Sequence, residues 1–99
     1  MRVLKSILKD SLSYYQRLER DLRWRLAKLP QGNVKRRRIR GHVYYYLQRR
    51  NGEKVIHRYL GRQKPVELLK EIQERRQLKQ ELAKVRAALR LLPRRKLAA

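Results

Sequence analysis

The sequence contains no cysteine, three prolines and four glycines in 99 residues. Without cysteine the chain can form neither a disulfide framework nor a thiolate metal site, which fits a reducing compartment. No apolar run is long enough to span a bilayer, and the first ten residues carry charges where a signal peptide would be apolar. We therefore expect a cytoplasmic protein, nucleoid-associated if the cell is prokaryotic, with no membrane partner.

Residues for metal or enzyme chemistry are scarce as well. The two histidines, His42 and His57, have no acid cluster near them in the sequence, so zinc binding is not expected. The serines, Ser6, Ser11 and Ser13, all fall within one predicted helix, and no glycine-rich phosphate loop is present. The acids lie almost entirely on predicted helices, at spacings that suit ion pairs better than paired-carboxylate or two-metal catalysis. The sequence predicts a non-enzymatic protein with no cofactor and no metal.

Acidic residues are few, and basic residues are abundant. Lys and Arg number 29 against 8 acids, which gives a formal net charge of +21. Residues 30–64 contain 11 basic side chains and one acid, Glu53, and so carry a net charge of +10. Such an excess destabilises a compact chain by self-repulsion unless a polyanion neutralises it, and nucleic acid is the common polyanion. A merely solvated basic surface is the alternative, but soluble domains usually mix the two signs more evenly.

Two long helices are predicted, one at each end of the chain. Apolar residues recur at steps of three and four over residues 3–29, and the first helix should end just before Pro30. Pro65 suits the first position of a second helix over residues 65–92, with Glu67 in its first turn. Pro93 ends this helix, and residues 93–99 read as a basic tail. The first apolar stripe consists of Leu4, Leu8, Leu12, Tyr15, Leu18, Leu22, Leu26 and Leu29.

Residues 34–60 between the helices read as three antiparallel strands. Asn51-Gly52 favours a type I′ hairpin turn, which would place Arg50 opposite Glu53 and Leu47 opposite Ile56. The fold class is therefore α+β: a long helix, a three-stranded antiparallel β-meander and a second long helix within one domain, 1–99. Each helix has a stripe of apolar side chains that it cannot bury without a partner helix. We expect the helices to form an antiparallel hairpin, either within the chain or across a homodimer.

The register of the first strand depends on the turn at Gly41. A three-residue loop, Arg40-Gly41-His42, would bury Ile39 opposite Val43 and place Arg36 and Arg38 beside the tyrosines. A two-residue loop, Gly41-His42, would place each of these side chains on the other face. We expect the three-residue loop, because it buries the isoleucine and exposes the arginines.

The second hairpin predicts two different sheet faces. The aliphatic face, expected to pack on the helices, holds Val43, Tyr45, Leu47, Ile56 and Leu60 together with Arg58. The open face holds Tyr44, Tyr46, Gln48, Val55, His57 and Tyr59. Aromatic and basic side chains on an open sheet suit nucleic acid, although the tyrosines could instead fill an interface. The predicted nucleic-acid-binding residues are Lys35, Arg36, Arg37, Arg38, Arg40, Tyr44, Tyr46, Arg49, Arg50, Lys54, His57, Arg58 and Tyr59.

The stretch from Gly41 to Gly61 combines a turn glycine, the strand YYYLQ, the Asn51-Gly52 turn and a closing Tyr-Leu-Gly. This pattern resembles one in small uncharacterised archaeal and bacterial proteins. It is also similar to the N-terminal β module of some insertion-sequence DDE transposases and to the arm-site-binding domains of tyrosine integrases. The resemblance implies a mobile-element or DNA-associated setting. Because no transposase catalytic core is present, the chain would act as a stand-alone accessory module.

The function expected from the sequence is binding of duplex DNA through the basic, tyrosine-rich sheet face, with flanking phosphate contacts from the basic helices. One alternative is an RNA-binding or ribosome-associated protein, because long basic helices beside a small sheet suit structured RNA. A second alternative is a helical oligomerisation or interaction protein, in which the apolar stripes form the binding surface. A membrane-surface role for the helices ranks last, because acids are interspersed on both of them.

Overall fold

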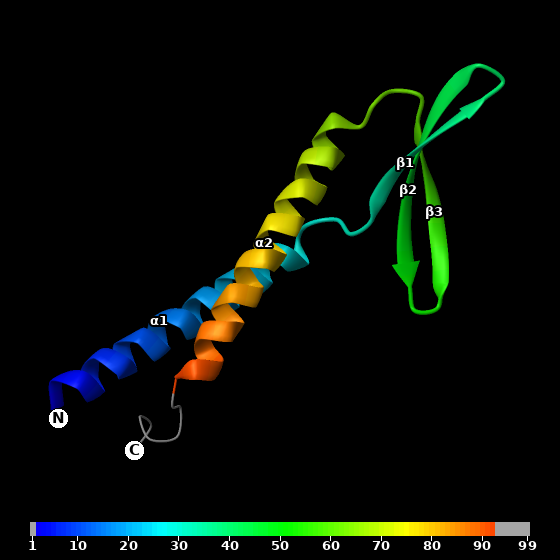
Figure 1. Cartoon of the computed structure of the whole chain (residues 1–99). Helices are drawn as coiled ribbons and strands as arrows, with labels where there is room; N and C mark the ends of the chain where they lie inside the picture. Colours follow the sequence, from blue (N-terminus) through cyan, green and yellow to red (C-terminus); the bar gives the residue numbers. More distant parts are fainter. Residues whose placement is uncertain (1, 93–99) are drawn as a thin grey trace. The chain divides into compact units, whose positions relative to one another are not determined.

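The computed structural model describes residues 2–92, in which one helix precedes and one helix follows three consecutive strands along the chain (Figure 1). This arrangement confirms the predicted α+β class, and the element bounds differ from those expected by one or two residues. The predicted basic tail, 93–99, lies outside the described residues. The elements are α1 (Arg2–Ala27), β1 (Asn33–Ile39), β2 (His42–Asn51), β3 (Lys54–Gly61) and α2 (Val66–Leu91).

The described residues form two compact units, and α2 contributes to both. The helical unit comprises residues 2–28 and 77–92, so it contains α1 and the second half of α2. The sheet unit comprises residues 29–76, so it contains the three strands and the first half of α2.

The helical unit is held together by the predicted apolar stripes. Leu22 of α1 and Leu89 of α2 are each only 1% exposed. Arg86 Nε of α2 donates to Glu19 Oε2 of α1 at 3.3 Å, and the two helical segments run in opposite directions (Figure 1). The helical hairpin therefore closes within one chain. The buried side chains of this unit are Leu12, Leu22, Leu78, Leu82, Val85 and Leu89.

The sheet has the order β1-β2-β3, and both strand pairs are antiparallel. The β1–β2 turn contains two residues, Arg40 and Gly41, because Ile39 pairs with His42. Both turn residues have positive φ, 52° and 82°, as a type I′ turn requires. The prediction of a three-residue loop was wrong. Each side chain of β1 therefore lies on the sheet face opposite to the one expected.

The β2–β3 turn also differs from the expected one. Asn51 pairs with Lys54, and the two turn residues are Gly52 and Glu53. Gly52 has φ 64°, and a type II′ turn needs positive φ only at its first central residue. The true register therefore differs from the expected one by two residues, and Leu47 lies opposite Arg58 instead of Ile56. Because a shift of two preserves the side-chain alternation, these two strands keep their predicted faces.

β3 does not pair with the first three residues of β2, 42–44. Tyr46 pairs with Tyr59, but Tyr45 pairs with Gly61, so Leu60 is an extra residue in a β-bulge. Beyond this bulge, residues 42–44 of β2 pair only with residues 37–39 of β1. Residues 37–44 thus form a two-stranded hairpin end, called the ribbon below, which projects past β3 (Figure 1).

Residues paired across strands share a face, so the registers define two faces. The Leu47 face carries the buried Leu47 and the half-buried Val34, Val43, Tyr45 and Ile56. The opposite face is called the tyrosine face. It consists of Asn33, Lys35, Arg37, Ile39, His42, Tyr44, Tyr46, Gln48, Arg50, Val55, His57 and Tyr59.

Gly32, immediately before β1, occupies a position that only glycine fits. Its φ is +123°, and an added Cβ would lie 2.6 Å from the Gln48 carbonyl oxygen. Gly41 is a matched control, because its φ is +82° but an added Cβ would meet nothing within 4 Å.

We expect Gly41→Ala to lower the free energy of unfolding by about 1–2 kcal/mol through backbone strain. Gly32→Ala should lower it by at least about 1 kcal/mol more, because it adds a clash with a backbone carbonyl. Urea denaturation of both variants measures the difference. Equal losses would show that the close approach of Gly32 to β2 contributes nothing.

Candidate nucleic-acid interface

Three tyrosine rings form a continuous cluster on the tyrosine face. The Tyr59 ring centroid lies 5.4 Å from that of Tyr46 and 6.2 Å from that of Tyr44. Tyr44 and Tyr46 are half-buried, whereas Tyr59 is 54% exposed. Two guanidinium groups cover the cluster: that of Arg37 lies 5.2 Å from the Tyr46 centroid, and that of Arg62 lies 5.8 Å from the Tyr44 centroid. Cation–π contacts of this kind hold the arginines over the rings while their N–H groups stay able to bind a ligand.

Arg62 also braces the ribbon at the point where β3 ends. Its Nη2 donates to Nδ1 of His42 at 2.7 Å. Because a guanidinium can only donate, Nδ1 accepts and the His42 imidazole carries its proton on Nε2. Arg62 and His42 were not among the residues predicted to bind nucleic acid. The alternation of β2 indicates that His42 shares a face with Tyr44, but nothing in the sequence indicates that Arg62 reaches back from beyond Gly61.

The arginines of β1 project from both sides of the sheet. Lys35 and Arg37 lie on the tyrosine face, opposite Tyr46 and Tyr44. Arg36 and Arg38, expected beside the tyrosines, lie on the Leu47 face instead, opposite Tyr45 and Val43. The physical reason is the two-residue Arg40-Gly41 turn, which also leaves Ile39, expected in the core, 47% exposed on the tyrosine face.

The predicted site residues are therefore divided between the two faces and the hairpin tip. Arg40 lies at the tip of the ribbon. On the tyrosine face are Lys35, Arg37, Tyr44, Tyr46, Arg50, His57 and Tyr59. On the Leu47 face are Arg36, Arg38, Arg49, Lys54 and Arg58.

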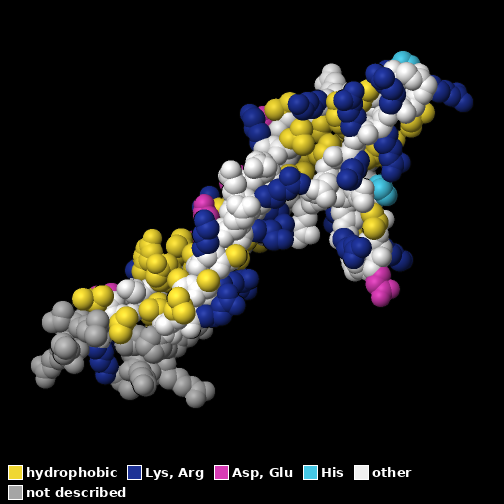
Figure 2. Space-filling view, in the orientation of Figure 1, with side chains coloured by type: hydrophobic (Ala, Val, Ile, Leu, Met, Phe, Trp, Pro, Cys, Tyr) yellow, Lys and Arg dark blue, Asp and Glu magenta, His cyan; other side chains and the backbone are white. Residues whose placement is uncertain are grey.

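The positive charge of the sheet is not compensated by acids. Lys and Arg side chains are spread over the sheet and its hairpin end, among hydrophobic side chains (Figure 2). The one acid of the hairpins, Glu53, lies in the β2–β3 turn. Within residues 2–92, no Lys or Arg of the three strands forms an ion pair with a carboxylate. The charges are therefore free to meet an external anion.

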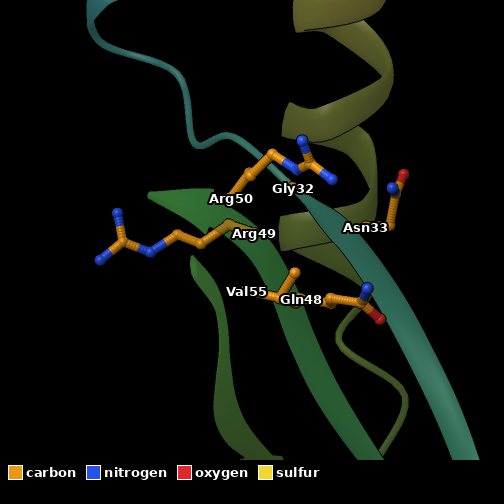
Figure 3. A pocket seen from close by; sticks show the side chains of 6 residues that line it. All are labelled: Gly32, Asn33, Gln48, Arg49, Arg50 and Val55. Atoms are coloured by element: carbon orange, nitrogen blue, oxygen red, sulfur yellow. The ribbon is translucent and has the colours of Figure 1, made fainter. Parts of the chain in front are cut away.

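A hollow of about 220 Å³ lies at the end of the tyrosine face where β1 begins and β2 ends. Four of its lining residues, Asn33, Gln48, Arg50 and Val55, belong to the tyrosine face. Gly32 also lines it, and a Cβ there would meet the Gln48 carbonyl oxygen and the side chains of Leu47 and Arg49. Arg49 also lines it, but its side chain extends in the direction opposite to that of Arg50 (Figure 3).

One family model matches this chain, over residues 4–71, and it is described as a domain of unknown function (DUF6788). The chain belongs to this family. No curated protein and no solved structure matches the chain significantly. The DUF6788 match includes α1 from Leu4 onward, all three strands and the beginning of α2 up to Glu71. The tyrosine cluster, the ribbon and the residues lining the hollow therefore all lie within the DUF6788 domain.

Between residues 2 and 92, no three or more His, Cys, Asp or Glu side chains are grouped so that they could hold a metal ion. Neither α1 nor α2, as far as the structure describes them, is apolar enough over its length to cross a membrane.

Proposed function

We propose that this protein is a non-enzymatic binder of duplex DNA and that the ribbon enters the major groove. The observation that carries the proposal is the end of β3 pairing at Gly61, which frees residues 37–44 as a two-stranded hairpin end. The major groove of B-DNA, about 12 Å wide, admits a two-stranded β-ribbon.

The charges of the ribbon suit insertion between two phosphate walls. Arg37 projects from one face of the ribbon, Arg38 from the other, and Arg40 from its tip. All three side chains are exposed. Arginine binds phosphate oxygens and also reads guanine through two parallel hydrogen bonds, so one ribbon can position itself and contact base edges.

The backbone at Arg40 supports a functional role for this side chain. Arg40 has φ 52°, a conformation that favours Asn, Asp or Gly at this position of a type I′ turn. Among residues 2–92, it is the one residue other than glycine with positive φ. An arginine in the left-handed region costs about 1–2 kcal/mol, and its charge at the ribbon tip offers a reason for that cost.

The sequence resemblance agrees with this proposal. The segment from Gly41 to Gly61 is similar to the β module of some insertion-sequence transposases and to integrase arm-site-binding domains, which implies a DNA-associated or mobile-element setting. We propose that the chain acts there as an accessory module.

Binding of single-stranded or folded RNA is the second candidate. The exposed Tyr59 ring, in contact with Tyr44 and Tyr46, offers a surface on which an unpaired base could stack. A-form RNA helices disfavour the ribbon mode, because their major groove is deep and narrow. The helical interaction role has less support, since the stripes of α1 and α2 already bury each other at Leu22 and Leu89.

Competition binding distinguishes these functions. A labelled duplex of mixed sequence, held by the full chain, should be displaced at least about tenfold more efficiently by unlabelled duplex DNA than by single-stranded DNA or folded RNA of equal length. The affinity should fall steeply with salt, because phosphate contacts release counterions. Stronger displacement by folded RNA would replace the DNA proposal with the RNA one, and no displaceable binding to any polyanion would refute both.

A further inference from the structure

The hollow at the far end of the tyrosine face carries donors but no carboxylate. Its lining offers the Arg50 guanidinium and the side-chain amides of Asn33 and Gln48. The Arg50 side chain extends in the direction opposite to that of Arg49 (Figure 3). Within residues 2–92 the Arg50 guanidinium has no hydrogen-bond or ion-pair partner. A positively charged, unpartnered donor at the rim of a polar hollow is the arrangement that an oxyanion requires.

Arg76 of α2 fixes the orientation of the Asn33 amide. Its Nη2 donates to Asn33 Oδ1 at 2.5 Å. Since a guanidinium can only donate, the oxygen of the Asn33 amide must face Arg76. The NH₂ group of Asn33 is then left to donate elsewhere. The hydrogen bond therefore fixes the NH₂ group of Asn33, a residue that lines the hollow, as a donor to groups other than Arg76.

The volume of the hollow limits what it can hold. At about 220 Å³ it is smaller than the 300–1,000 Å³ pockets that enclose cofactors or drug-sized ligands. A tetrahedral phosphate group, with three or four exposed oxygens, fits both the volume and the three donors. A larger residue at position 32 would collide with the Gln48 carbonyl oxygen beside the hollow.

We propose that this hollow binds one phosphate group of the DNA backbone, outside the groove that the ribbon occupies. Gln48 and the tip residue Gly41 are seven residues apart, about 24 Å along β2 at roughly 3.4 Å per residue. That span is about twice the width of the major groove, so the hollow would meet a flanking phosphate and fix the register of the protein on the duplex. The assignment of this phosphate to DNA rests on the proposed function; the affinity of the hollow for phosphate does not.

The test uses inorganic phosphate and duplex DNA as two separate probes of the full chain. In a phosphate titration followed by amide NMR, the signals of Gly32, Asn33 and Gln48 should shift in the wild type with millimolar affinity. Arg50→Gln should weaken this phosphate affinity at least fivefold. In duplex binding, Arg50→Gln should reduce the salt slope of log K by about 0.9, the value of one phosphate contact.

Arg20→Gln is the matched control, because it removes the same charge from an exposed residue of α1 that does not line the hollow. It should leave the phosphate titration within twofold of the wild type. Equal phosphate affinities in the two variants, or no shift at these amides, would overturn the hollow as a phosphate site even if the duplex binds. Retained phosphate binding without duplex binding would refute the DNA proposal, and the site would then serve a free phosphate.

Discussion

Removal of the four arginines around the hairpin tip is expected to weaken duplex binding by about a hundredfold to a thousandfold. The variant is Arg36→Gln, Arg37→Gln, Arg38→Gln and Arg40→Asn, which lowers the net charge from +21 to +17. Each arginine that contacts DNA contributes roughly 1 kcal/mol or more, and four such losses multiply. The slope of log K against log salt should fall by about 3 to 4 if all four meet phosphates. Fluorescence anisotropy with a labelled duplex at several salt concentrations measures both quantities.

The ribbon variant is expected to stay folded. All four side chains are exposed, and exposed substitutions usually change stability by less than about 0.5 kcal/mol. Asparagine at position 40 should even stabilise the turn, since it tolerates positive φ better than arginine does. Circular dichroism and urea denaturation check this before binding is compared.

A second variant with the same net charge separates contact from general attraction. Arg17, Arg20, Lys79 and Lys84 are exposed residues of the helical unit, and their replacement by glutamine also gives +17. This variant loses the long-range attraction of four charges but keeps the ribbon, so its affinity should fall less than about tenfold. Equal losses in the two variants would mean that the ribbon has no special role and that only total charge matters.

Periodicity and turn residues were enough to predict the elements and the class of this fold. The steps of three and four in α1, Pro30, Pro65 and the glycine turns locate every helix and strand within two residues. These signals are local, because each depends on the conformation of a few consecutive residues. The division of β2 and β3 into a tyrosine face and a Leu47 face followed from alternation alone.

The details that shape the candidate site depend on interactions that the sequence does not display. The β1–β2 register depends on a turn in which Arg40 has positive φ. Arginine disfavours this conformation, so residue propensities do not predict the turn. The bulge at Leu60 sets the length of the ribbon, and strand alternation alone does not predict it. The contacts of Arg62 with His42 and of Arg76 with Asn33 join residues 20 and 43 positions apart, so no local pattern could reveal them.

Truncation of the helical core is expected to have the largest effect on stability. Leu89 is 1% exposed between α1 and α2, and Leu→Ala at such a site costs about 2–5 kcal/mol through lost burial and the cavity that remains. A chain of this size has a total stability of roughly 5–15 kcal/mol, so the loss would remove a large part of it. Urea denaturation followed by far-UV circular dichroism measures the loss, because both helices contribute to this signal.

Leu91 provides the control for this core truncation. It lies two residues further along α2, and it is 85% exposed. Leu91→Ala removes the same atoms from the same helix, and alanine has the higher helix propensity, so the change in stability should stay within about 0.5 kcal/mol. The urea midpoint of Leu89→Ala should therefore fall far below that of Leu91→Ala. If the two midpoints coincided, the packing of α1 against α2 within one chain would not be what holds the helical unit together, and a partner chain would have to supply the missing contacts.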